Sequence, residues 1–394
     1  MRVPPGLRRS AAAVGALALA VVVVRSAAVQ AFAERDPQTA EAIWSGHPSA
    51  AIGLASVEIA KAAGAGKPID DNAFETLSLA ATKAPLEPQP FIVRGIRLQL
   101  EGRGDDAERA FAAASWRNPR SIPARYFLAN TRLSRGNVDG LREVAALARL
   151  SPEGLVTSTP YLAAFARQKQ ALKPMRALFA SNPAIRSAVL SNLAQDPGNL
   201  SLVLELGGTG DVANAPWLAA MIRTLVEHRQ YASARSLWEK SSGIDRSATQ
   251  SLLFDANFSD SASIPPFNWE LTSSTLGLAE RRSGRLQAIY YGQDNGPLAR
   301  QLLVLGPGRY RFEAPAKGAV ESGEGTALLW TVRCADSKGN EALASAPASA
   351  GGLIFVVPAS CPAQWLELAG RSSDTGREIE MTIGPVSLSR AGGE

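Results

Sequence analysis

The chain has 394 residues, of which 46% are hydrophobic and 20% are charged, so it is too long for one typical domain and has an ordinary globular composition. Its formal net charge of +5 comes from scattered basic residues, and no basic cluster with interleaved aromatics supports nucleic-acid binding. The two histidines, His47 and His228, lie far in sequence from the two cysteines, so we expect no metal site and no cofactor.

Residues 1–34 have the layout of an export segment. Arg2, Arg8 and Arg9 precede an uninterrupted apolar run over residues 11–24, as in a basic n-region followed by an apolar h-region. Arg25 interrupts the run, but the apolar stretch behind it could extend a helix with the arginine snorkelling to water. The positive-inside rule then predicts that the rest of the chain lies across the membrane.

Two small-residue patterns that suit signal-peptide cleavage occur at residues 26–28 and 31–33. A cleaved signal peptide and a retained signal-anchor, in contact with the membrane through residues 11–33, therefore both remain open. The anchor predicts a bacterial inner-membrane protein that faces the periplasm. The cleaved signal predicts an exported soluble periplasmic protein.

Residues 35–245 are rich in alanine and leucine with helical periodicity and short Pro, Gly and Asn breaks. One set of four residues recurs after 34 positions (107 minus 73). The first copy has Ala73, Leu77, Ala80 and Pro85, and the second has Ala107, Phe111, Ala114 and Pro119. Looser copies begin at Gly140 and Ala171, with Leu147 and Leu178 in place of the second small residue, and a last degenerate pair covers residues 217–238.

This pattern resembles the tetratricopeptide repeat family, whose signature has a small residue, a large apolar one, another small one and a closing proline. The best copy also has Phe91, Gly95 and Leu98 in its first helix. Small residues at Gly95 and Ala107 would let the two helices of a repeat approach closely, while Phe111 would fill the space between repeats. The resemblance implies a helical-repeat solenoid that binds a partner protein.

After Gly243 the pattern changes to short runs of alternating polarity between glycine, proline and serine, which predicts an antiparallel β-sandwich over residues 250–392. The candidate strands are Leu286–Tyr291, Arg300–Val304, Gly308–Ala314, Ala327–Cys334, Leu353–Val357, Gln364–Leu368 and Glu378–Leu388. The predicted fold class is therefore multidomain, with α-helices followed by β-strands.

Three segments of this region resemble carbohydrate-binding modules with a galactose-binding-type jelly-roll fold. They are residues 254–258 with 266–269, residues 300–312, and the closing strand at residues 383–388. These motifs mark strands and turns, so the resemblance implies a jelly roll more than it implies sugar binding. The whole combination resembles a group of bacterial envelope proteins with an N-terminal membrane segment, tetratricopeptide-like repeats and a lectin-like sandwich.

Cys334 and Cys361 are the two cysteines of the chain. In an exported protein such a pair predicts a disulfide, and two buried reduced thiols are the alternative. Strand alternation predicts that Tyr310 and Phe312 face the core and that Trp330 packs beside the disulfide.

Sugar recognition commonly combines an aromatic face with planar amides and guanidinium groups. The glycan-binding candidates on this basis are Trp269, Tyr291, Arg300, Gln301 and Trp365. Trp365 shares its strand face with Glu367, which predicts an exposed platform, whereas core packing is the alternative for each candidate. Asp255 and Asp260 lie where related modules hold calcium, but without an oxygen cage we expect surface loop residues.

No residue pattern predicts catalysis. We therefore expect a non-enzymatic envelope adaptor, whose solenoid binds a partner protein and whose sandwich contacts a polysaccharide or a second protein, in polysaccharide assembly or export. One alternative is a glycan-processing enzyme with carboxylates at the sandwich rim. Another is a ligand-free structural sandwich that caps the repeats.

Overall fold

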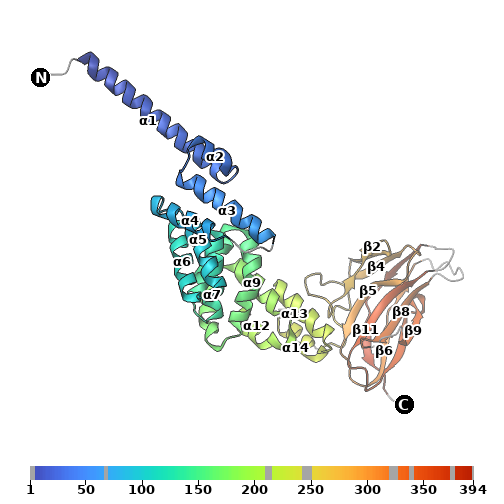
Figure 1. Ribbon diagram of the computed structural model, residues 1–394. Helices are drawn as coiled ribbons and strands as arrows, with labels where there is room; N and C mark the ends of the chain where they lie inside the picture. Colours follow the sequence, from blue (N-terminus) through green and yellow to red (C-terminus); the bar gives the residue numbers. More distant parts are fainter. Residues whose placement is uncertain are drawn as a thin grey trace. The chain divides into compact units, whose positions relative to one another are not determined.

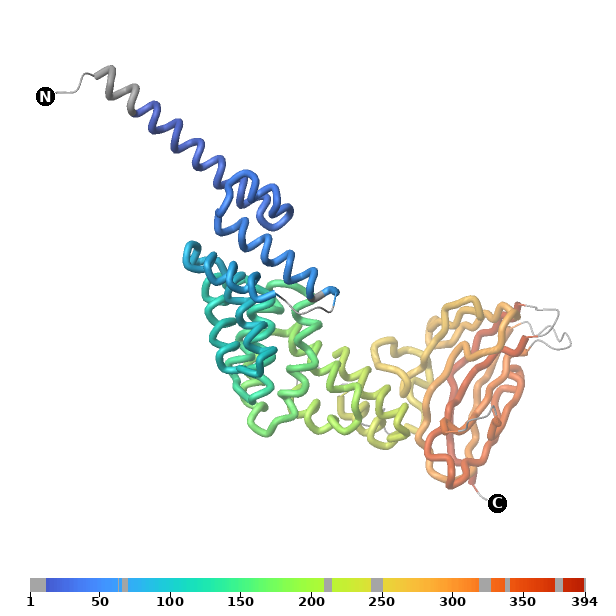
Figure 2. Tube along the Cα trace, viewed as in Figure 1, coloured from blue at the N-terminus to red at the C-terminus, as the bar shows by residue number. Residues whose placement is uncertain are grey.

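The computed structural model of the chain describes residues 5–65, 70–208, 215–241, 251–318, 327–336, 341–372 and 378–392, without the side chains of residues 5–11 and 63 (Figures 1 and 2). The basic residues Arg2, Arg8 and Arg9 of the predicted export segment lie outside the described side chains. Helices form the N-terminal part and antiparallel sheets form the C-terminal part, as predicted.

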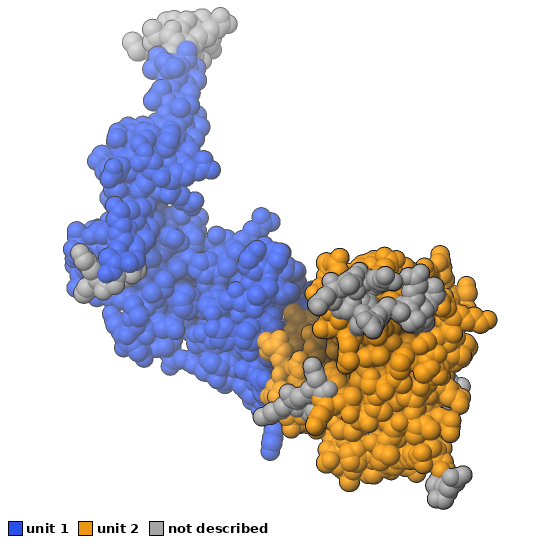
Figure 3. Space-filling model, turned by 90° about the vertical axis from the view of Figure 1, so that its right-hand side faces the viewer, with its two compact units in different colours: residues 1–185 blue, residues 186–394 orange. Residues whose placement is uncertain are grey.

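The chain divides into two compact units, residues 1–185 and 186–394 (Figure 3). The change of pattern after Gly243 predicts a boundary between residues 245 and 250, whereas the observed division falls within the helical part. The last helices therefore belong to the same compact unit as the sheets.

The described helices of the first unit are α1 (Pro5–Ala33), α2 (Pro37–Ile43), α3 (Pro48–Gly64), α4 (Asp71–Lys83), α5 (Gln89–Leu100), α6 (Gly104–Arg117), α7 (Ile122–Ser134), α8 (Gly140–Leu150), α9 (Pro152–Ala166), the 3₁₀ turn η1 (Lys169–Ala171) and α10 (Leu172–Ser181). Local sequence sets many of their starts. The side chains of Asp36, Asp70, Ser121 and Ser151 accept hydrogen bonds from the first backbone amides of α2, α4, α7 and α9. Proline near the start of α2, α5, α7 and α9 removes an amide that would have no partner there.

Helices α5 and α6 approach closely because a glycine faces an aromatic ring. A Cβ atom at Gly95 would lie 2.8 Å from the ring of Phe111, so a larger residue fits there only if the ring moves. Phe111 is fully buried, and Leu98, Ala107 and Ala114 are buried with it. Small residues thus determine the spacing of this helical pair.

The second unit contains the larger part of α11 (Pro183–Leu193), the 3₁₀ turn η2 (Pro197–Asn199), α12 (Leu200–Gly207), α13 (Pro216–Glu227) and α14 (Tyr231–Ser241). Its strands are β1 (Glu270–Leu271), β2 (Ser273–Ser274), β3 (Gly277–Arg282), β4 (Arg285–Tyr290), β5 (Gly296–Leu303), β6 (Gly308–Glu313), β7 (Ala316–Lys317), β8 (Ala327–Cys334), β9 (Ala342–Pro347), β10 (Gly352–Val357), β11 (Gln364–Arg371), β12 (Ile379–Ile383) and β13 (Ser387–Arg390), with the 3₁₀ turn η3 (Ala348–Ala350).

The described strands form three antiparallel sheets. The orders are β1-β5-β11-β8-β9, β2-β3-β4-β12-β7 and β10-β6-β13. Side chains from all three sheets meet in one hydrophobic core, which includes Trp269, Tyr290, Tyr310, Phe312 and Trp330. Tyr310 and Phe312 therefore face inward as predicted, and the charged residues that alternate with them, Arg309, Arg311 and Glu313, are exposed.

Helix α14 packs against the sheet region within this unit. The indole N–H of Trp238 donates a hydrogen bond of 3.0 Å to the carbonyl oxygen of Ile264. Its ring contacts Phe254 and Phe267, with centroids 4.9 and 5.8 Å away, and all three rings are buried. An aromatic cluster therefore attaches the last helix to the sheets.

Candidate functional site

A row of polar side chains crosses the five strands of the sheet β1-β5-β11-β8-β9. The row takes one side chain from each strand, and neighbouring members are paired in register: Glu270, Arg300, Glu367, Thr331 and Ser345. Their strand neighbours Leu366, Leu368 and Trp330 belong to the core, so alternation directs the row to the outer side of the sheet. We call these five residues the polar row.

Two arginine–glutamate pairs organise the polar row. Nε of Arg300 donates to Oε2 of Glu270 at 2.7 Å. Arg333, on the same side of β8, holds Glu367 at two points, with distances of 3.0 and 2.9 Å. The Glu367 side chain is only 8% exposed, and this forked contact compensates its buried charge. The surface thus offers fixed donors and acceptors without an excess of either charge.

Trp365 lies beside the polar row and is partly exposed. The guanidinium carbon of Arg300 is 4.7 Å from the centroid of the Trp365 ring, a cation–π contact. In register, Trp365 is flanked by Leu302 on β5 and Arg333 on β8. The structure therefore brings together two of the five predicted glycan-binding residues, Arg300 and Trp365.

The other three candidates lie elsewhere. Trp269 is 2% exposed and donates its indole N–H to the backbone oxygen of Asp255 at 3.1 Å. Gln301 is fully buried, where its amide exchanges hydrogen bonds of 3.1 and 3.0 Å with the backbone of Phe254. Tyr291 is 38% exposed, but it follows β4 in a different sheet. Trp269 and Gln301 are structural in this conformation, since a glycan cannot reach buried groups that already have partners.

The expectation that Asp255 and Asp260 are surface loop residues is wrong for Asp255. Its side chain is 1% exposed and pairs with Arg281 at 3.3 Å. One carboxylate oxygen also accepts from the backbone amides of Ser259 and Asp260, at 2.6 and 3.0 Å. Burial opposes ionisation of Asp260, but hydrogen bonds from Ser263 and the amide of Ala262 hold the pKa of Asp260 below its usual value. N–H groups and a guanidinium thus occupy the oxygens that a calcium ion would use.

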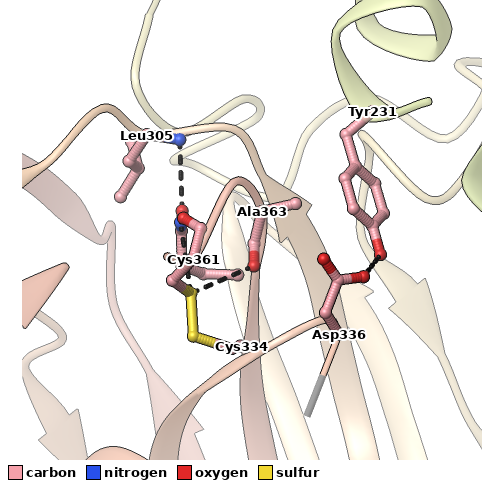
Figure 4. The surroundings of a disulfide bond; sticks show 7 residues. Tyr231, Leu305, Cys334, Asp336, Cys361 and Ala363 are labelled. Carbon is pink, nitrogen blue, oxygen red and sulfur yellow. Dashed lines mark hydrogen bonds between the residues drawn. A yellow bond between two sulfur atoms is a disulfide. The ribbon is translucent and has the colours of Figure 1, made fainter. Parts of the chain in front are cut away.

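The predicted disulfide is confirmed. Cys334, the last residue of β8, is bonded to Cys361, which precedes β11 (Figure 4). The side-chain amide of Gln364 donates a hydrogen bond of 2.8 Å to the carbonyl oxygen of Cys361. It also accepts one of 3.1 Å from the backbone N–H of Leu305. The alternative of two reduced thiols is wrong. The Trp330 ring, on the same strand as Cys334, packs against the rings of Phe312 and Trp269, with ring centroids 4.8 and 6.1 Å apart.

The first unit has a groove of about 460 Å³ between α4 and α5. The Arg97 guanidinium lies 4.5 Å from the ring of Phe74 on one wall and pairs with Glu101 at 2.9 Å. Arg94, one turn earlier, is exposed and forms no ion pair with a described residue. Phe91 also lines the groove, and the Arg117 guanidinium lies 3.7 Å from its ring. Pro119 lies two residues beyond the end of α6, after the C-cap residue Asn118.

Sequence reasoning missed Glu270, Arg333, Thr331 and Ser345 as members of this surface. The signal that could have found them is strand register, which a single sequence does not determine. Among the described residues, no cluster of three or more metal-ligating side chains occurs. Comparisons of the chain with protein-family models and with curated proteins returned no match.

Proposed function

We propose that this protein is a non-enzymatic adaptor of the bacterial envelope, held at the inner membrane and facing the periplasm. In this proposal the sheet region contacts a polysaccharide, and the helical region binds a partner protein. Two observations support the location: Ala12–Ala33 is long and apolar enough to cross a membrane, and the Cys334–Cys361 disulfide suits an oxidising compartment.

The observation that carries polysaccharide contact is the arrangement of Trp365 and Arg300 beside the polar row. An aromatic ring can stack under the apolar face of a sugar, while carboxylate, guanidinium and hydroxyl groups bond its hydroxyls. A surface of paired charges suits a neutral, hydroxyl-rich chain, since it offers donors and acceptors in equal measure. The sheet region would then be a jelly roll of the carbohydrate-binding type.

The helical region is proposed to be a tetratricopeptide-like solenoid. The 34-residue spacing and the close packing of Gly95 on Phe111 support this. The groove with Phe74, Arg94 and Arg97 is the proposed contact for the partner protein. Crosslinking and pull-down from membranes tests it, since Arg94→Glu should weaken recovery of the partner that the native chain retains. Equal recovery by both would count against the groove.

Polysaccharide contact is tested with the full chain in lipid nanodiscs on a glycan array. The native chain should bind, and Trp365→Ala should weaken binding about tenfold, which corresponds to roughly 1.4 kcal/mol of lost contact. Tyr291→Ala is the matched control, because it removes a partly exposed aromatic ring from another sheet. It should bind like the native chain.

One observation favours a second candidate, a ligand-free sheet region that caps the helical part. The aromatic cluster of Trp238, Phe254 and Phe267 already uses part of the sheet region to hold α14. Absence of glycan binding by the native chain would support this capping function. An enzymatic function has less support, because the carboxylates of Glu270 and Glu367 are each already paired with an arginine.

A further inference from the structure

Helix α1 changes its surroundings at Arg25. Before this residue, large apolar side chains are more than half exposed; they are Val14, Leu17, Leu19, Val21, Val22, Val23 and Val24. Apolar exposure on this scale needs an apolar environment, and the length and composition of the helix suit a lipid bilayer.

Beyond Arg25 one face of the same helix packs on the protein, while Ala27, Gln30 and Phe32 stay exposed. Val29 is 0% exposed, and it packs with Ala33 against residues of α2 and α3 in one cluster. A Cβ atom at Gly53 of α3 would lie 2.1 Å from the carbonyl oxygen of Ala33, so the two helices meet backbone to backbone there. Residues 26–28 and 31–33 are helical, and a helix held by these contacts does not present the extended, flexible chain that a protease cleaves.

Arg25 is held where the two environments meet. Its Nε donates a hydrogen bond of 2.8 Å to the carbonyl oxygen of Ile43, the last residue of α2. Its guanidinium lies 4.8 Å from the ring of Trp44, whose other neighbour is His47 with a centroid distance of 5.2 Å. Helix α2 therefore folds back along α1, so that Trp44 lies at the level of Arg25. The pairing of tryptophan with arginine is typical of a membrane–water interface.

We propose that α1 is retained as an uncleaved anchor, that it leaves the bilayer at Arg25, and that Arg25 and Trp44 contact phospholipid headgroups there. The inference rests on the export and membrane attachment that are part of the proposed function, and it adds the point of exit and the headgroup contacts. Residues 26–33 then lie outside the bilayer, although their composition alone continues the apolar run.

The length of the helix is consistent with this exit point. Arg25 lies 16 residues after Arg9 in the same helix, which is about 24 Å at 1.5 Å per residue. That is shorter than a typical hydrocarbon core of about 30 Å. The Arg25 side chain reaches outward to the headgroups, and local thinning of the bilayer compensates for the remaining difference in length.

The test uses single cysteines in the full chain, because both native cysteines are in the disulfide. Gln30→Cys lies beyond the proposed exit, Val22→Cys lies before it, and Leu100→Cys on α5 reports export. Spheroplasts that produce each variant are treated with a membrane-impermeant maleimide, and the intact mass of the extracted protein is measured. We expect the full-length mass, labelling of Gln30→Cys and Leu100→Cys, and labelling of Val22→Cys only after detergent is added.

Each of the other outcomes contradicts one part of the proposal. A mass that lacks the first 28 or 33 residues, with Leu100→Cys labelled, overturns retention and the membrane attachment of the proposed function, but it leaves export and the proposed polysaccharide and partner contacts standing. Labelling of Val22→Cys without detergent overturns the exit at Arg25. No labelling of Leu100→Cys in intact spheroplasts overturns export, and with it both proposals.

Headgroup contact has its own readout. The full chain and its Trp44→Phe variant are placed in phosphatidylethanolamine–phosphatidylglycerol vesicles that contain a lipid spin-labelled at the headgroup. Quenching of tryptophan fluorescence should be greater for the native chain, by the contribution of Trp44. Equal quenching of both proteins overturns the headgroup contact.

Discussion

The hydroxyl group of Tyr231, the first residue of α14, donates a hydrogen bond of 2.5 Å to Asp336, which lies two residues beyond Cys334 (Figure 4). Nε of Arg229 lies 3.4 Å from the same carboxylate. Burial, together with the hydrogen bond and the negative charge of Asp336, raises the pKa of Tyr231 well above its ordinary value of 10.0. This contact therefore ties the last helix to the disulfide-bonded end of β8.

The Tyr231 contact predicts a pH dependence at alkaline pH. Because the folded-state pKa is raised, its stabilisation is complete below pH 10 and is lost as the pH rises beyond 10, where the unfolded chain ionises first. Tyr231→Phe should lower the free energy of unfolding by about 2 kcal/mol at pH 7, as for a lost hydrogen bond to a charged group. Urea unfolding followed by circular dichroism should show this difference shrink between pH 9 and 11. In the control Tyr291→Phe, the free energy of unfolding should change with pH as it does in the native chain.

Gly95 predicts a steric limit in the first unit. In Gly95→Ala the new methyl group meets the Phe111 ring at 2.8 Å, so overpacking should exceed the gain of about 1 kcal/mol in helix propensity. We expect a net loss of about 1–2 kcal/mol in thermal unfolding. Gly64→Ala, at a helical position with open space, should be neutral or stabilising. Adding Phe111→Leu should recover part of the loss, and an unchanged melting temperature for Gly95→Ala would contradict the packing argument.

The disulfide joins residues 27 positions apart. In the chain-entropy model, closing such a loop contributes on the order of 3 kcal/mol, so Cys334→Ser with Cys361→Ser should lower the free energy of unfolding by about that amount. Alkylation of the denatured native protein, followed by intact mass, should show both thiols protected until a reductant is added. Free alkylation without reductant would remove the basis of this prediction.

Sequence pattern predicted the order of helices and strands because both depend on local periodicity. The seven predicted strands are all present, although residues 378–388 divide into β12 and β13 around Gly384 and Pro385. Strand β3 was missed because its sequence ends in charged residues, and β9 because its residues are small. Alternation along one strand was also sufficient to direct Tyr310 and Phe312 inward.

The candidate site was less predictable because it depends on contacts between distant segments. Alternation along β11 directed Trp365 and Glu367 to one side, but the pairing of Glu367 with Arg333 requires the register of β8. Glutamine is usually found at the surface, yet the side-chain amide of Gln301 is hydrogen-bonded to the backbone N–H and carbonyl of Phe254, which is 47 positions away. Tertiary partners of this kind have no local signal in the sequence.

The pairing of the buried Asp255 carboxylate with Arg281 predicts that calcium has no effect on stability. Arg281 supplies the positive charge beside the Asp255 carboxylate, and its Nη2 also donates to Asn268 and to the Trp269 carbonyl at 3.2 and 3.3 Å. Added calcium or a chelator should therefore leave the melting temperature of the native chain unchanged. Arg281→Met should lower the free energy of unfolding by about 3–5 kcal/mol, because it leaves a buried carboxylate without its cation. Arg281→Lys should lose less stability, since it keeps the positive charge but not the planar guanidinium that also donates to Asn268 and to the Trp269 carbonyl. A rise in the melting temperature of the native chain with calcium would contradict this account, because it would require carboxylate oxygens that the observed N–H donors leave available.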